Sequence, residues 1–165
     1  MNHGMCRLDP VPGRANSIAP KKYVLNNMCP TIVLKRGNPL FCLGAIGGRK
    51  IITSVVQLLV NFLDFSMPPH QALSAPRCHC ENNYPLFLEL HKSDFITPSF
   101  ADDSDQKIKS WGFHKKTFDR LADLGQEARS IFRNGGPAQA IFYDKINDEL
   151  IAAVDPRGDG YISCL

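Results

Sequence analysis

The residues with the clearest chemical potential are two adjacent glycines, Gly47 and Gly48, which end the segment Gly44-Ala45-Ile46-Gly47-Gly48. Adjacent glycines allow consecutive backbone N–H groups to point into one cavity, and a helix that starts there adds about half a positive charge. The pattern favours an anion or a developing oxyanion, which Arg49 and Lys50 would reinforce. The alternative is a sharp turn that binds nothing. The segment is neither a GxGxxG nor a Walker motif.

A second group of potential ligands surrounds His79, which lies between Cys78 and Cys80. In a strand the two cysteines point to one face and the histidine to the other, so the three side chains do not converge on one ion. The chain also has no second, suitably spaced cysteine pair. We therefore predict ordinary strand residues here and no metal site.

The remaining candidates for chemistry are weaker. Asp102, Asp103 and Asp105 resemble a calcium loop only superficially, because the glycine and the terminal glutamate of that loop are absent. They are typical of a solvated loop. Serine, threonine, cysteine and histidine residues are present, but no nucleophile elbow or triad motif frames any of them.

The glycines must be positioned by the elements on either side of them. Runs at 31–35 and 39–43 read as two strands, and Arg36-Gly37-Asn38 between them predicts a β-hairpin. The apolar period then becomes helical, which predicts a buried helix that starts at Ile51 and ends near Ser66, ahead of two prolines. The residues on its apolar stripe are Ile51, Ile52, Val55, Val56, Leu58, Leu59, Phe62 and Leu63.

The rest of the chain alternates short elements without a regular β-α-β order. We predict a short helix over 68–75, strands over 77–80 and 86–90, an amphipathic helix over 116–124 ended by Gly125, and strands over 138–143 and 149–154. Residues 1–29 are predicted to form an extended arm, and residues 91–114 a loop or insertion. This order indicates an α+β fold.

Length and composition exclude several classes of protein. A chain of 165 residues, 44% hydrophobic and 21% charged, is typical of one packed domain, here 1–165. The net charge of +3 is spread without a run of like charges, which argues against nucleic-acid binding. The apolar run 51–65 contains Gln57, Asn61 and Asp64 and is shorter than the roughly 20 residues that a membrane span needs.

The cysteine content and the first residues bear on the compartment. Six cysteines are too few for a disulfide-stapled secreted domain, so free thiols are expected. The first ten residues lack an apolar core behind a basic start, so they do not read as a signal peptide. The compartment itself stays unknown from these patterns.

Several short segments together resemble the C-terminal part of the small subunit of γ-glutamyltranspeptidases (glutathione hydrolases). The resemblance is dense to about His79, loosens over 80–115 and returns over 118–157. It rests on the order and spacing of Asn16–Pro20, Asn26–Leu34, Leu43–Gly48, Ile51–Thr53, Ala75–Arg77 and Asp155–Arg157.

The resemblance implies an N-terminal-nucleophile hydrolase fold, so that this chain would form a partial αββα sandwich. It implies cleavage or transfer of γ-glutamyl amides such as glutathione by an N-terminal threonine whose own amine is the base. Gly47 and Gly48 match the family's two oxyanion-hole glycines. A Ser-Ser pair that holds the substrate α-carboxylate falls on Asn26 and Asn27, whose amides can still donate. This chemistry implies no cofactor.

Two departures from the family pattern leave two hypotheses open. The threonine nucleophile would lie before Asn2, so we expect it in a missing N-terminal portion or a large subunit. Family residues that hold the substrate amino group would fall around Gly4 and Arg7, neither of which can accept from an ammonium through its side chain. The chain is therefore either a γ-glutamyltransferase-like segment or a degenerate, non-catalytic member that acts as a binding or interaction protein. Unpaired sheet edges would favour a homo-oligomer.

Overall fold

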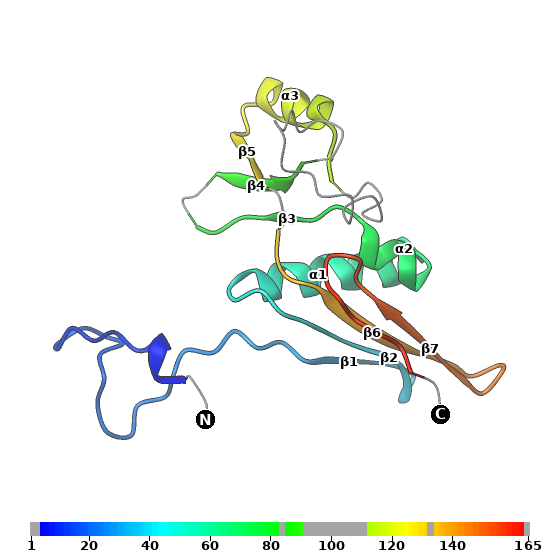
Figure 1. Ribbon diagram of the computed structural model, residues 1–165, viewed down its shortest axis with the longest axis horizontal. Helices are drawn as coiled ribbons and strands as arrows, with labels where there is room; N and C mark the ends of the chain where they lie inside the picture. The colour runs from blue at the N-terminus through cyan, green and yellow to red at the C-terminus, as the bar shows by residue number, and fades with distance from the viewer. Residues whose placement is uncertain (1–3, 83–84, 91–111, 132–133, 164–165) are drawn as a thin grey trace.

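The computed structural model describes residues 4–82, 85–90, 112–131 and 134–163. Its strands form two separate sheets, one with the order β1-β2-β6-β7 and a smaller one with the order β3-β4-β5 (Figure 1). Helices and strands are mixed without regular alternation, so the predicted α+β class is confirmed.

The larger sheet is antiparallel throughout and is built from two hairpins. It consists of β1 (Thr31–Lys35), β2 (Asn38–Ala45), β6 (Ala138–Asp144) and β7 (Glu149–Val154). The first hairpin turns at Arg36 (φ 53°) and Gly37 (φ 79°), with Lys35 opposite Asn38. Two successive positive φ angles are typical of the two-residue turns that match strand twist. The hairpin predicted from the sequence is confirmed.

Helices α1 (Lys50–Leu63) and α2 (Pro69–Ser74) cover one face of this sheet (Figure 1). The buried stripe of α1 includes Ile51, Val55, Leu58 and Phe62. Phe62 packs against Phe41 of β2 and Phe142 of β6, with ring centroids 5.2 and 4.7 Å away. The core therefore lies between the two helices and the larger sheet.

The sequence reading of α1 needs two corrections. The helix ends at Leu63 and not near Ser66, because Ser66 adopts a positive φ of 50° and the N–H of Met67 bonds back to the carbonyl of Asn61 at 2.9 Å. This closure caps the helix before the prolines are reached. The helix is also not buried all round, since Ile52, Val56 and Leu63 are about half exposed.

The smaller sheet combines β3 (Cys78–His79), β4 (Leu86–Glu89) and β5 (Ala128–Ile131). Strand β4 pairs antiparallel with β3 and parallel with β5, and α3 (Lys115–Asp123) precedes β5. Gly125 ends α3 with φ 79°, as predicted. Strand β5 was not predicted, because its four residues include Arg129 and Ser130 and show no apolar alternation.

A buried cluster of charges joins the two sheets. Five polar residues, each no more than 2% exposed, come from β4, from the segments that enter β3 and β6, and from the turn after β7. They are Arg77, Glu89, Asn134, Asp155 and Arg157. Arg157 donates to both carboxylates, and Arg77 pairs with Asp155, so each buried charge has an opposite partner.

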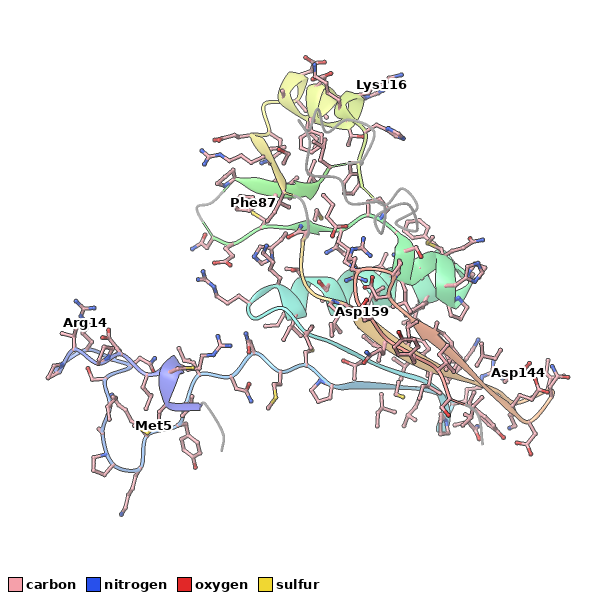
Figure 2. All side chains as sticks on the ribbon, in the orientation of Figure 1. Met5, Arg14, Phe87, Lys116, Asp144 and Asp159 are labelled. Carbon is pink, nitrogen blue, oxygen red and sulfur yellow. The ribbon has the colours of Figure 1, made fainter. Side chains whose placement is uncertain are left out.

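Residues 4–29 contribute little regular structure. A single turn of 3-10 helix, η1 (Gly4–Arg7), is followed by one bridge between Asp9 and Ser17. Figure 2 shows Met5 and Arg14 on this arm, away from both sheets. Most of the predicted loop or insertion over 91–114, namely residues 91–111, lies outside the described residues. In the described part of the chain no helix has the length and apolarity to span a membrane.

Candidate active site

The glycine turn connects the end of β2 to the start of α1. Gly47 and Gly48 both have positive φ angles, 132° and 64°. Their carbonyls accept from the first helical N–H groups, those of Lys50 at 3.3 Å and Ile51 at 3.2 Å. Within the described ranges, no acceptor takes the N–H of Gly47 or of Gly48. Two successive donors therefore lie unengaged at the amino terminus of a 14-residue helix, where a negative charge is favoured.

A second glycine pair, Gly135 and Gly136, fixes the path of this turn. The N–H of Gly136 donates to the carbonyl of Ile46 at 3.0 Å, and the N–H of Ile46 donates to the carbonyl of Pro137 at 3.2 Å. A Cβ on Gly47 would lie 2.7 Å from the nitrogen of Gly136, closer than real side chains approach. Glycine at position 47 is therefore required both by its backbone angle and by the contact with Gly136.

The buried charges also contact the segment of the second glycine pair through hydrogen bonds to its backbone. Arg77 donates from Nη1 to the carbonyl of Gly136 at 3.1 Å. Asp155 accepts the N–H of Ala138 at 3.1 Å and pairs with the guanidinium of Arg77. Burial lowers the pKa of Arg77, with its pairing to Asp155 acting in the opposite direction. The charged cluster thus reaches the glycine turn through a continuous series of hydrogen bonds.

Of the two predicted carboxylate-binding asparagines, Asn27 lies beside the turn. A Cβ on Gly48 would lie 3.7 Å from Nδ2 of Asn27, and this nitrogen is buried without a hydrogen-bond partner in the described residues. Asn26 is more exposed, and its Oδ1 accepts the N–H of Met28 at 3.0 Å. The structure therefore brings Asn27 next to Gly48, with a donor that has no other partner.

A cavity of about 680 Å³ opens beside the two asparagines and Arg49, and its lining in the described residues includes neither Gly47 nor Gly48. The asparagines and Arg7 of the arm form one wall, and the first turn of α1 with the end of β3 forms the other. A smaller cavity of about 320 Å³ continues along the arm past Gly4 and Arg7. The positions that depart from the family pattern therefore border the candidate site. The residues that line the larger cavity are Cys6, Arg7, Leu25, Asn26, Asn27, Arg49, Ile52, Thr53, His79, Cys80, Glu81 and Asn82.

Sequence reasoning missed a polar chain on the far wall of this cavity. Thr53 Oγ1 lies 2.8 Å from Nδ1 of His79, whose Nε2 lies 2.9 Å from Oε1 of Glu81. The other oxygen of Glu81 pairs with Arg49 at 2.9 Å. The hydrogen bond from His79, helped by the charge of Arg49, lowers the pKa of the Glu81 carboxyl. Arg49 is thus engaged by Glu81, and no sequence pattern links Thr53 to a histidine 26 positions away.

The cysteines near the site do not form a metal centre in the described residues. No group of three or more histidine, cysteine or acidic side chains converges there. His79 is buried and Cys80 exposed, in keeping with the predicted alternation along the strand. Burial raises the pKa of the Cys78 thiol, which donates to Oε1 of Gln57 at 3.3 Å.

Comparison with known proteins shows the family of the chain. The model of the family Gamma-glutamyltranspeptidase matches residues 2–165. The chain belongs to this family. A glutathione hydrolase proenzyme of Escherichia coli (strain K12) is 44% identical over 147 residues, which is 89% of this chain and 22% of that protein. An Acylase ACY 1 proenzyme of Pseudomonas sp. (strain SE83) is 44% identical over 92 residues, 56% of this chain and 16% of that protein.

Solved structures of the γ-glutamyltranspeptidase family share the fold. Gamma-glutamyltranspeptidase from Pseudomonas nitroreducens, complexed with L-DON, matches with a TM-score of 0.75 and 28% identity, over 100% of this chain and 81% of that chain. The N-terminal-nucleophile hydrolase fold expected from the resemblance is therefore confirmed. The present chain spans only about a fifth of the curated relatives named above.

Proposed function

We propose that this chain supplies the oxyanion-hole and carboxylate-binding part of a site for γ-glutamyl amide cleavage and transfer. Gly47 and Gly48 would donate to the oxyanion, and Asn27, with Asn26, would hold the α-carboxylate of a γ-glutamyl compound such as glutathione. The observation that supports this most directly is the pair of unengaged glycine N–H groups beside the unpartnered amide of Asn27. Preorganised donors of this kind can contribute a hundredfold or more to the rate.

We also propose that the nucleophile comes from a part of the protein outside these 165 residues. The hydroxyls nearest the turn in the described residues do not suit the role. Thr53 bonds to His79 and to the carbonyl of Lys50 at 3.1 Å, and Ser54 is 1% exposed. An N-terminal threonine has a free α-amino group that acts as its base. Thr53 and Ser54 lie inside a helix, where the backbone nitrogen is an amide and cannot act in this way.

The outer face of the larger sheet is where the remaining part of the sandwich would pack. Helices α1 and α2 cover the inner face, whereas Ile32, Ile141 and Leu150 on the outer face are 73%, 44% and 72% exposed. Ile32 and Ile141 both lie opposite Cys42, so the apolar row crosses three adjacent strands. An apolar patch of this extent marks an interaction surface. A second sheet, from a preceding portion or a large subunit, would complete the αββα order.

One observation favours the alternative of a non-catalytic binding protein. Among the described residues, Arg7 lines the cavity. The acidic residue that lines it, Glu81, is already paired with Arg49 and His79. No carboxylate on this wall is therefore unengaged and able to hold a substrate ammonium. A degenerate member could keep the anion-binding glycine turn without turning over γ-glutamyl substrates.

Two measurements test the proposal. L-Glutamate added to the ¹⁵N-labelled chain should shift the amide signals of Gly47, Gly48 and Asn27, with Gly37 and Gly125 as unaffected controls. Absence of any shift at the glycine turn would contradict the binding role. The pure chain should not release the chromophore from a γ-glutamyl anilide, whereas adding a separate polypeptide that carries the threonine should restore release. Turnover by the chain alone would contradict an external nucleophile.

A further inference from the structure

His79 is a buried imidazole that the proposed reaction does not use. It is 4% exposed, lies opposite Phe87 of β4 and has a polar partner on each ring nitrogen. Figure 2 labels Phe87 on the smaller sheet, above the helices that cover the larger one. His79 therefore connects the smaller sheet to helix α1 through its side chain.

The contacts of His79 hold the first turn of α1 at two points. Thr53 binds Nδ1 directly, and Glu81 joins Nε2 to the guanidinium of Arg49, the residue that caps the helix. Arg49 and Thr53 are four positions apart, so they lie on one face of the helix. The result is a closed loop of interactions that runs from the helix to β3 and back.

This first turn has little other support at its amino terminus. The cap of α1 makes no side-chain hydrogen bond, and no acidic residue lies in the first turn. Capping side chains and nearby negative charges normally supply this stabilisation. Glu81, from the segment that follows β3, is the carboxylate that faces the basic residues Arg49 and Lys50 here.

The glycine turn is hydrogen-bonded to the first helical turn, because the carbonyls of Gly47 and Gly48 accept from the N–H groups of Lys50 and Ile51. We propose that His79, through Thr53 and Glu81, is a positioning residue for the Gly47–Gly48 turn. Without it, the two glycine donors lose their fixed direction although the fold persists. The inference rests on the proposed function only for the role of the turn in binding an oxyanion; the positioning of the turn by His79 does not depend on that function.

Paired substitutions at Thr53 separate positioning from general stability. Thr53→Val removes the hydroxyl at nearly constant volume, and Thr53→Ser keeps it. Thr53→Val should speed hydrogen exchange at the amides of Lys50 and Ile51 by about fivefold or more, because it removes the contact of the hydroxyl with His79 as well as its bond to the carbonyl of Lys50. The amides of Leu43 and Ala140 in the larger sheet should change little, and Thr53→Ser should restore wild-type exchange.

Substitutions at His79 provide a second, independent test. Asn places its amide near Nδ1 of the imidazole, and Gln places it near Nε2, so His79→Asn should keep the bond to Thr53 and His79→Gln the bond to Glu81. Each should disturb the glycine amide signals less than His79→Leu. Equal acceleration of exchange at all amides, or unchanged exchange at Lys50 and Ile51 in Thr53→Val, would overturn the inference.

The two proposals fail in different ways. If wild-type chain does not bind L-glutamate but Thr53→Val still loosens the turn, the proposed function fails and the positioning stands. If L-glutamate binds wild type and Thr53→Val equally, with the turn unchanged, positioning by His79 is wrong and the proposed function stands. Weaker L-glutamate binding by Thr53→Val, with recovery in Thr53→Ser, supports both.

Discussion

Arg157 and Glu89 form a two-pronged ion pair that is completely buried, although 68 positions separate them in the chain. Nε of Arg157 donates to Oε1 of Glu89 at 2.9 Å, and Nη2 donates to Oε2 at 2.5 Å. The same carboxylate accepts the backbone N–H groups of Arg77 and Asn134, each at 2.8 Å. The pair therefore joins the turn after β7 to β4, and so ties the larger sheet to the smaller one.

Removing one member of this pair should be severe. Arg157→Met leaves the Glu89 carboxylate buried without its cation, which typically costs about 3–5 kcal/mol of unfolding free energy. Arg129→Met, at an exposed ion pair with Glu127, is the matched control and should cost under about 1 kcal/mol. Chemical denaturation measures both. Similar losses in the two variants would contradict the role assigned to the buried pair.

The two site glycines should respond differently to alanine. Gly48→Ala meets only Asn27 at 3.7 Å, so it should cost about 1–2 kcal/mol for the left-handed backbone. Gly47→Ala adds a 2.7 Å contact with the backbone of Gly136, so its loss of unfolding free energy should exceed that of Gly48→Ala by about 1–3 kcal/mol. Thermal or denaturant unfolding compares them directly. Equal losses would show that the contact with Gly136 relaxes freely.

The exposed sheet face should drive self-association of the chain by itself. Ile141→Lys places a charge on the outer face of β6, between buried Ala140 and partly buried Phe142, without touching the core. It should shift the chain toward monomer in analytical ultracentrifugation. Ile146→Lys is the control, because Ile146 is 93% exposed in the turn after Asp144, at the tip of the hairpin in Figure 2. A wild-type monomer at high concentration would contradict this prediction.

Glu81 should give a specific dependence of stability on pH. Because its pKa is lowered in the fold, its contribution is complete above the ordinary value of 4.5 and is lost as the pH falls through the lowered value. Glu81→Gln should therefore be less stable than wild type near neutral pH, and the two curves should converge in acid. Denaturation across this range provides the measurement. A constant difference down to the acid limit would exclude the contacts with His79 and Arg49 as the cause.

Thiol reactivity should distinguish two cysteines. Cys42 is exposed on the outer sheet face, whereas Cys78 is half-buried and burial raises the pKa of its thiol. Since the thiolate is the reactive form, Cys78 should react with a disulfide reagent at least about tenfold more slowly than Cys42. Peptide mapping after brief labelling identifies the sites. Faster labelling of Cys78 would contradict its burial against Gln57.

Local patterns were sufficient for the elements around the site. The alternation of strand residues, the Arg36-Gly37 turn and the helical spacing from Ile51 placed the hairpin, the glycine turn and α1 in their correct order, because each depends on neighbours within a few positions. The same patterns placed β6 and β7. The family motifs then connected Gly47 and Gly48 with Asn26 and Asn27.

What the sequence by itself determined is therefore the α+β class, the family and the turn that carries the candidate oxyanion hole. Only the tertiary structure decided which distant residues support it: the pairing of β5 with β4, the contact of Gly136 with Gly47, the bond from Thr53 to His79, and the burial of Arg157 against Glu89. Local spacing contains no signal for such contacts. They arise when two sheets and a helix pack together, because most polar groups that become buried must then find partners within the protein.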